Sequence, residues 1–263
     1  MIAANRSEAV RGGERAQVII KMANSEKSLR VLVIIPAYNE AASLPALIGG
    51  LRVLYPEFDV LVVDDGSTDQ TASVVSRLPV RLISLPCNLG VGGAVQTGLL
   101  LAQRESYDVA VQVDGDGQHP PEEIAKLLAG MKQQGSAVVL GSRFLSTKGY
   151  HSTASRRLGI RFFSWILSAL CGTPITDATS GFRAWNRQAI QVLAKHYPED
   201  YPEVEAILLL HQANLRISEV PVRMAERAAG RSSIGSWQAI TYMIRVSLAI
   251  LMNLLRKRET RSL

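Results

Sequence analysis

The chain has 263 residues, of which 47% are apolar and 20% are charged, so it is not an intrinsically disordered protein and can fold as one large or two small domains. The formal charge of +6 favours a partner that carries phosphate, whether a nucleotide, a nucleic acid or an anionic membrane. Cys87 and Cys171 have no metal-ligand or redox spacing, which predicts two reduced core thiols in a cytosolic compartment. Residues 1–29 contain no secretory signal, and we interpret them as a flexible or loosely docked arm.

Short apolar runs alternate with helical patterns from about residue 30 to residue 142. The runs predict strands at 31–35, 60–63, 80–85, 109–113 and 137–140. Helices are predicted at 41–54, at 92–104, from Pro120 onward, and after the second strand, where Ser67 or Thr68 is suited to be the N-cap. Continuous apolar strands with helical crossovers predict an α/β fold whose mostly parallel sheet is covered by helices on both faces.

The alternation weakens after residue 142. Further elements are predicted as helices at 161–171 and 203–214, a last strand at 215–222, and a long apolar helix at 237–255 that precedes a basic triplet. We therefore expect an arm at 1–29, one α/β domain at 30–235, and an amphipathic helix with a basic tail at 236–263.

Two acidic residues, Asp114 and Asp116, follow the fourth predicted strand, at the edge where parallel sheets bind ligands. Carboxylates this close repel each other unless a cation lies between them, and Gln118 adds a neutral oxygen ligand. The pattern favours Mg²⁺ or Mn²⁺, which would neutralise a departing diphosphate. An EF-hand is excluded, because His119 occupies the position of the required glycine and Ala125 that of the closing glutamate.

Two other polar clusters end strands at the same edge, at residues 36–40 and 64–67, where an aromatic ring and carboxylates can hold a base and a ribose. A dinucleotide-binding site is disfavoured, because Val95 replaces the third glycine of its fingerprint, and no Walker A sequence is present.

These clusters together resemble the family 2 glycosyltransferases of GT-A fold. The matching segments are residues 36–40, 64–69, 88–90 and 114–120. Later segments are similar to the dolichyl-phosphate mannose synthase branch, namely residues 141–143, Asp177, residues 180–183, residues 219–222, Arg227, Gly230, Ser232 and Ser233. The resemblance covers about residues 30–255.

The resemblance implies a metal-dependent, inverting transfer of a sugar from a UDP- or GDP-linked donor to a polyprenyl phosphate. Pro36, Tyr38, Glu40 and Asp65 would line the nucleotide pocket, and Arg227 would meet the donor diphosphate. Gly115, Arg183 and Ser233 are implied as further substrate-binding residues, and Asp114, Asp116, Arg143 and Arg227 as the catalytic ones. Asp114, Asp116 and Gln118 would hold the metal and the diphosphate. Arg143, with Arg156 or Arg157, would bind the acceptor phosphate.

The chemistry of a phosphate acceptor agrees with this set. A polyprenyl monophosphate is already an anion, so the site must supply positive charge rather than a strong base. A hydroxyl acceptor in glycan synthesis would instead need a carboxylate base, for which Glu203 and Glu205 are the candidates, and this alternative stays open. A catalytically silent nucleotide-binding module is a more distant alternative. A nucleic-acid partner is disfavoured, because no basic stripe with interleaved aromatic residues is visible.

The predicted helix at 237–255 has barely the length of a membrane span and contains Arg245 and Asn253. Its polar residues form one narrow stripe, which favours a helix lying in the membrane surface over a span. We expect a peripheral or monotopic protein at the cytoplasmic face of the membrane. Packing on the enzyme's own core or on a small integral-membrane partner is the alternative.

Overall fold

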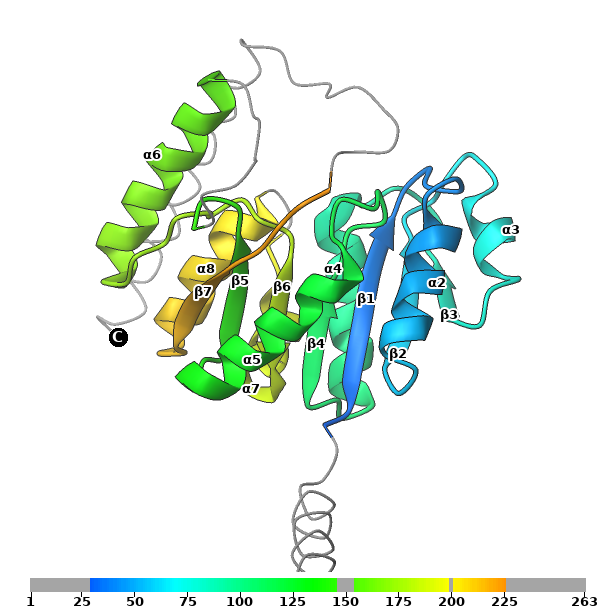
Figure 1. Cartoon of the computed structure of the whole chain (residues 1–263), viewed down its shortest axis with the longest axis horizontal. Helices are drawn as coiled ribbons and strands as arrows, with labels where there is room; N and C mark the ends of the chain where they lie inside the picture. The colour runs from blue at the N-terminus through cyan, green and yellow to red at the C-terminus, as the bar shows by residue number, and fades with distance from the viewer. Residues whose placement is uncertain (1–28, 146–153, 199–200, 226–263) are drawn as a thin grey trace, which may run out of the picture. The chain divides into compact units, whose positions relative to one another are not determined.

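The computed structural model describes residues 29–145, 154–198 and 201–225, with the side chains of residues 154–158 excepted (Figure 1). The strands are β1 (Val31–Ala37), β2 (Asp59–Asp64), β3 (Arg81–Ser84), β4 (Val109–Gln112), β5 (Val138–Ser142), β6 (Arg183–Asn186) and β7 (Ile217–Pro221). The helices are α2 (Leu44–Leu54), α3 (Thr71–Val75), α4 (Gly90–Arg104), α5 (Ile124–Gln134), α6 (Ala154–Cys171), α7 (Arg187–His196) and α8 (Pro202–Gln212), and a 3-10 turn, η1 (Pro121–Glu123), precedes α5.

In the described part of the chain, the strands form one seven-stranded sheet in the order β3-β2-β1-β4-β6-β5-β7. All neighbours pair in parallel except β6, which is antiparallel to both β4 and β5. The predicted α/β fold with a mostly parallel sheet is therefore confirmed. Strand β6 and helix α7 were not predicted. Because β6 is antiparallel to β4, it begins at the carboxyl edge of the sheet, and the segment just before Arg183 therefore lies at that edge.

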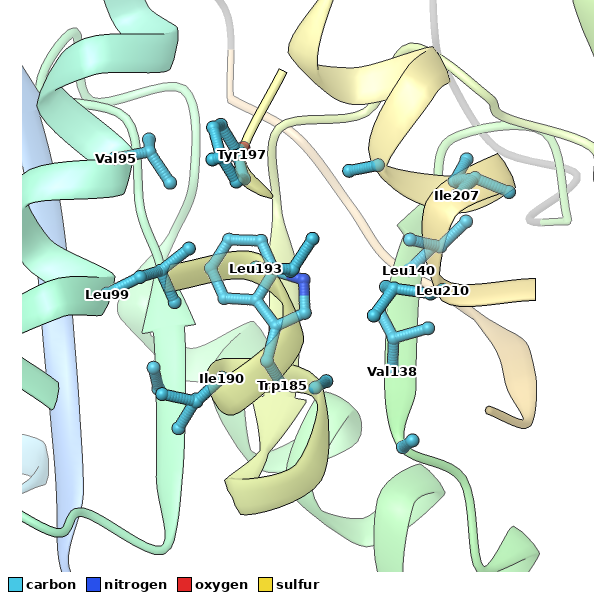
Figure 2. Packing of buried hydrophobic residues seen from close by; sticks show 14 of the residues in the cluster. Val95, Leu99, Val138, Leu140, Trp185, Ile190, Leu193, Tyr197, Ile207 and Leu210 are labelled. Carbon is cyan, nitrogen blue, oxygen red and sulfur yellow. The ribbon is translucent and has the colours of Figure 1, made fainter. Parts of the chain in front are cut away.

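Helices cover both faces of the sheet, as the apolar strands require. One face packs against α4, α6, α7 and α8, with Trp185 of β6 fully buried among Leu99, Ile190 and Leu193 (Figure 2). The opposite face packs against α2 and α5. Strand β1 contributes to both faces, because successive side chains of a strand point to opposite sides.

Two local predictions are wrong. Neither Ser67 nor Thr68 caps α3, whose N-cap is Gln70, because the Ser67 hydroxyl instead accepts the backbone N–H of Asn39 at 3.0 Å. Cys87 is exposed on a loop at the carboxyl edge, so only Cys171 is a core thiol.

Among the described residues, no helix combines the length and the apolar character that crossing a bilayer requires. The predicted helix at 237–255 lies outside the described residues.

Candidate active site

The carboxyl ends of the parallel strands bring those predicted site residues that the structure describes to one edge of the sheet. The loops after β1 and β2 are tied together by Asn39, which adopts a left-handed conformation (φ 57°). Its side-chain oxygen accepts the N–H groups of Thr68 at 2.9 Å and Asp69 at 3.2 Å. Tyr38, beside it, is 45% exposed, so its ring is open to a ligand.

Other members of the expected nucleotide pocket are held by the protein itself. Asp65 is buried, and its Oδ1 accepts the N–H of Leu89 at 2.7 Å, which fixes the start of α4 to the end of β2. Pro36 is buried within β1. Glu40 accepts the Ser43 hydroxyl at 2.8 Å. The pocket wall is therefore braced by these residues, while the exposed ring of Tyr38 is its accessible part.

The acidic turn after β4 is organised by hydrogen bonds to its own neighbours. Asp114 Oδ1 accepts Gln112 Nε2 at 3.0 Å, and the Asp114 N–H donates to His119 Nδ1 at 2.9 Å. Asp116 Oδ1 accepts the N–H of Gln118 at 3.0 Å, and Gly117 between them has a φ of 76°. These hydrogen bonds thus fix the positions of two half-exposed carboxylates, those of Asp114 and Asp116.

The buried side chain of His119 packs against the interior side of this turn. It is buried and stacks on Phe182 with ring centroids 4.8 Å apart. Gly115 is also buried, and a Cβ there would lie 3.1 Å from the Pro36 carbonyl oxygen, so the turn packs tightly on the end of β1. Through these contacts His119 braces the acidic turn.

The donor set fits a cation that a diphosphate helps to hold. Within the described residues, no group of three or more histidine, cysteine or acidic side chains is close enough to form a complete metal site. Asp114, Asp116 and Gln118 would therefore supply only part of a coordination shell. Mg²⁺ is commonly bound in this way, by one or two carboxylates plus substrate phosphates.

A buried ion pair stands at the end of β5. Arg143 donates from Nε to Asp177 Oδ2 at 2.6 Å and from Nη2 to Oδ1 at 2.7 Å, and the Asp177 side chain is completely buried. Glu219 of β7 secures the loop of Asp177, since it accepts the N–H groups of Thr176 at 2.8 Å and Asp177 at 3.0 Å. Burial raises the pKa of the Glu219 carboxyl above its usual value.

Arg183 is almost completely buried under the acidic turn, with 1% of its surface exposed. Its Nε donates to the Ser180 carbonyl at 2.6 Å and its Nη2 to the Ala178 carbonyl at 3.1 Å. Burial lowers its pKa, while the charges of Glu203 and Asp114 oppose that effect. The structure thus places Arg183 in the interior of the protein rather than in an open pocket, near enough to Asp114 for its pKa to be influenced by that carboxylate.

Glu203, in the first turn of α8, belongs to the same charged group. Burial raises the pKa of its carboxyl, the nearby Arg183 opposes this, and the negative charge of Asp114 adds to the increase. The charges of Arg183, Asp114 and Arg143 all influence this pKa, so the half-buried Glu203 carboxyl lies near these three residues. The sequence analysis named Glu203 only as a candidate general base for the alternative reaction, in which the acceptor is a hydroxyl group.

The chain after β7 returns across the acidic turn. The N–H of Val222 donates to the Ser142 carbonyl at 3.1 Å, that of Arg223 to Glu123 Oε2 at 3.0 Å, and that of Ala225 to the Gln118 carbonyl at 3.0 Å. These three hydrogen bonds hold residues 222–225 next to the acidic turn. The expected site residues Arg227 and Ser233, and the side chains of Arg156 and Arg157, lie outside the described residues.

Asp177, Gly181 and Glu219 support the site but were not predicted as site residues. A Cβ on Gly181 would lie 2.9 Å from Asp114 Oδ2 and 3.1 Å from Oδ1, so only a glycine leaves room for that carboxylate. These residues stood in sequence segments recognised as motifs. Their contacts depend on the antiparallel entry of β6, which local patterns did not reveal.

A mostly parallel sheet with one antiparallel strand, whose carboxyl edge carries paired acidic residues and an exposed tyrosine, agrees with the GT-A fold. The family described as Glycosyl transferase family 2 matches residues 32–193. The chain belongs to this family, and it is a glycosyltransferase.

Curated relatives match most of the chain. It is 33% identical over 219 residues to an undecaprenyl-phosphate mannosyltransferase from Micrococcus luteus, covering 78% of this chain and 88% of the relative. It is 32% identical over 213 residues to a UDP-N-acetylglucosamine–dolichyl-phosphate N-acetylglucosaminyltransferase from Methanococcus voltae, covering 73% and 84%. A polyprenol monophosphomannose synthase from Mycolicibacterium smegmatis is 31% identical over 228 residues, covering 83% and 86%.

A solved structure supports the fold. Glucosyl-3-phosphoglycerate synthase from Mycobacterium tuberculosis, crystallised with Mg²⁺ and UDP, matches with a TM-score of 0.66. The match covers 86% of this chain and 82% of that one at 21% identity, so the likeness shows the GT-A fold alone.

Proposed function

We propose that this protein transfers a sugar from a nucleotide-sugar donor to a polyprenyl phosphate. The observation that carries the proposal is the presence, at one edge of the sheet, of a turn with two carboxylates after β4 and a buried arginine at the end of β5. The first suits a nucleotide diphosphate with its cation, and the second suits an anionic acceptor. The names of three relatives, all of which act on polyprenyl or dolichyl phosphates, support the same acceptor class.

In this reaction a phosphate oxygen of the acceptor attacks the anomeric carbon of the donor sugar. The bond from that carbon to the diphosphate breaks, the nucleoside diphosphate leaves, and the configuration inverts. Because the attacking phosphate is already ionised, the protein has only to align it and to balance charge. Arg143 is suited to this task, since Asp177 fixes its guanidinium in one orientation.

The donor is expected to contact Tyr38 and the residues of the acidic turn. Mg²⁺ or Mn²⁺, held by Asp114, Asp116 and Gln118, would stabilise the charge that develops on the leaving diphosphate. The relatives named above use different sugars, so their similarity supports no single donor. We place the reaction at the cytoplasmic face of the membrane, where nucleotide sugars and the lipid phosphate can meet.

A hydroxyl acceptor is the second candidate, and Glu203 is the observation that favours it. A carboxyl whose pKa burial has raised is closer to the ideal for a general base at neutral pH. The variant Glu203→Gln separates the two functions. It should keep most of the activity on a phosphate acceptor and lose at least about a hundredfold on a hydroxyl acceptor.

The proposed function is tested with radiolabelled UDP-glucose, UDP-N-acetylglucosamine and GDP-mannose. Each is incubated with the protein, Mg²⁺ and membranes containing undecaprenyl or dolichyl phosphate, and the lipid is extracted with organic solvent. We expect one donor to label the extracted lipid. Label that appears only in a water-soluble saccharide would refute the polyprenyl acceptor, and nucleotide binding without any transfer would support the silent module.

A further inference from the structure

The hydroxyl of Ser43 joins the start of α2 to the acidic turn. Its Oγ lies 2.7 Å from the carbonyl oxygen of Gly115, which is 72 positions further along the chain. The same Oγ lies 2.8 Å from the Glu40 carboxylate and 3.1 Å from the Glu40 carbonyl oxygen. Ser43 therefore contacts both the wall of the expected nucleotide pocket and the residue between the two acidic ones.

The direction of the hydrogen bond to Gly115 follows from the chemistry of its two groups. A backbone carbonyl can only accept, and a serine hydroxyl carries a single hydrogen. Because an ionised Glu40 carboxylate also only accepts, that hydrogen is shared between Glu40 and Gly115. A distance of 2.7 Å is typical of an O–H···O hydrogen bond, so Ser43 donates to the Gly115 carbonyl at full strength.

Ser43 does not use its hydroxyl for the role that serine commonly has at the start of a helix. It is the N-cap of α2, where a serine oxygen usually accepts an N–H group of the first helical turn. Within the described α2, the side chain of Ser43 makes no such bond, because its backbone is helical (φ −89°, ψ −35°) rather than extended, and Pro45 has no N–H. The hydroxyl is thus directed to the acidic turn instead of to its own helix.

The Gly115 carbonyl belongs to the planar peptide that links Gly115 to Asp116, so a hydrogen bond to it limits the rotation of that peptide. Gly115 also packs closely on the loop after β1. An added Cβ would lie 3.1 Å from the Pro36 carbonyl oxygen and 3.5 Å from Glu40 Cγ. Ser43 therefore fixes the peptide just before Asp116 at a point where the turn touches its neighbour.

The two carboxylates of the turn are positioned by different elements. Gln112 of β4 donates to the Asp114 carboxylate, whereas Ser43 at the start of α2 acts on the peptide before Asp116. We expect loss of the Ser43 hydroxyl to disturb Asp116 more than Asp114.

We propose that Ser43 is a positioning residue, which holds the Gly115–Asp116 peptide, and with it the Asp116 carboxylate, in the arrangement that binds a divalent cation together with a nucleoside diphosphate. This inference rests on the proposed function, because it deepens the role assigned there to Asp116. It does not depend on the identity of the acceptor.

The first test measures Mn²⁺ binding by calorimetry in full-length protein saturated with UDP or GDP. Ser43→Ala loses the bond to Gly115 and should bind Mn²⁺ about tenfold more weakly than the wild type. Ser43→Thr keeps a hydroxyl and should bind like the wild type. So should the matched control Ser76→Ala, whose exposed hydroxyl donates to the Ser73 carbonyl at 2.9 Å. Equal Mn²⁺ affinity of Ser43→Ala and the wild type would overturn the proposal, as would a Ser43→Thr that binds as weakly as Ser43→Ala.

A second measurement shows whether Ser43 acts through the acidic turn or only supports the fold. Without a cation, in EDTA, Ser43→Ala and the wild type should bind UDP or GDP equally, because Asp116 then has no cation to hold. The melting temperature of Ser43→Ala should change as little as that of Ser76→Ala. An equal loss of nucleotide affinity with and without Mn²⁺ would assign Ser43 to the nucleotide pocket or to the fold, and the proposal would be wrong.

Kinetics separate this inference from the proposed function. In sugar transfer to polyprenyl phosphate, the Mn²⁺ concentration that gives half the maximal rate should rise about tenfold in Ser43→Ala, while the KM for the lipid stays the same. If both proteins transferred sugar to the lipid with the same Mn²⁺ requirement, the inference would fail and the proposed function would stand. A wild type that labels no lipid, together with weaker Mn²⁺ binding by Ser43→Ala, would refute the proposed acceptor and support the role of Ser43. A wild type whose nucleotide binding does not respond to Mn²⁺ or Mg²⁺ would refute the proposed cation and this inference with it.

Discussion

Asp177 holds Arg143 through both of its carboxylate oxygens, at 2.6 and 2.7 Å, and also accepts the Arg143 backbone N–H at 3.1 Å. The two residues are 34 positions apart and both are buried. A guanidinium held by two parallel bonds has one orientation, which is what a residue that aligns an anion requires. The pair therefore links the stability of the site to the orientation of the arginine that we propose to bind the acceptor phosphate.

Breaking this pair should affect stability and acceptor use differently. Asp177→Ala leaves a buried guanidinium unpaired, and we expect it to lower the free energy of unfolding by about 3–5 kcal/mol. Arg143→Lys keeps the charge but loses the paired bonds, so the KM for polyprenyl phosphate should rise about tenfold or more while the KM for the donor changes little. Denaturant unfolding and steady-state kinetics measure these effects. A donor KM that rises equally would remove Arg143 from the acceptor end.

The acidic turn is tested by Asp116→Ala. We expect kcat to fall by orders of magnitude, because a catalytic cation contributes several kcal/mol to the transition state. The melting temperature should change little, since Asp116 is half-exposed and its bond to the N–H of Gln118 is local. Chelation of the wild type should reproduce the loss, and Mg²⁺ or Mn²⁺ should reverse it. The exposed Glu122, altered to alanine, is the control; near-normal turnover of Asp116→Ala would refute the metal assignment.

Gly181→Ala tests whether space beside Asp114 matters. The added methyl would lie within 2.9–3.1 Å of both Asp114 carboxylate oxygens and 3.1 Å from Gln112 Nε2, so the carboxylate has to move. We expect kcat/KM to fall at least about tenfold, and calorimetry should show weaker Mn²⁺ binding in the presence of nucleoside diphosphate.

The matched control for that variant is Gly49→Ala on α2, where an added Cβ meets nothing within 4 Å. It should leave activity unchanged and stabilise the helix by up to about 1 kcal/mol. If Gly181→Ala behaved in the same way, Asp114 would not depend on this contact.

Glu203 makes stability depend on pH. Because burial raises its pKa in the folded protein, the native state keeps a proton that the unfolded chain releases near pH 4.5. Stability is therefore fully present below that pH and falls as pH rises through the folded pKa, by at most about 1.4 kcal/mol per pH unit. Glu203→Gln removes this dependence, so its stability relative to the wild type should increase with pH across that range.

Denaturant unfolding at about pH 5, 6, 7 and 8 measures this difference. Glu57→Gln, at an exposed position on the loop between α2 and β2, provides the comparison. A difference between Glu203→Gln and the wild type that stays constant with pH would show that Glu203 titrates alike in the folded and unfolded states.

Much of the fold follows from the sequence alone. The apolar runs that became β1, β2, β4 and β5 are recognisable because each strand is buried on both faces, and this burial is encoded locally. The order of strand, polar turn and helix then places Asp114, Asp116 and Tyr38 at one edge of the sheet, because parallel strands share the direction of their carboxyl ends.

The tertiary structure decided what those patterns could not. Strand β6 has four residues and begins with the charged Arg183, so its stability comes from pairing with β4 and β5 rather than from its own pattern. Only that pairing buries Arg183, sets Gly181 against Asp114, and leads the chain from Asp177 to the edge of the sheet. Contacts between residues far apart in the chain depend on how the elements pack, and the hydrophobic periodicity of a single segment does not predict that packing.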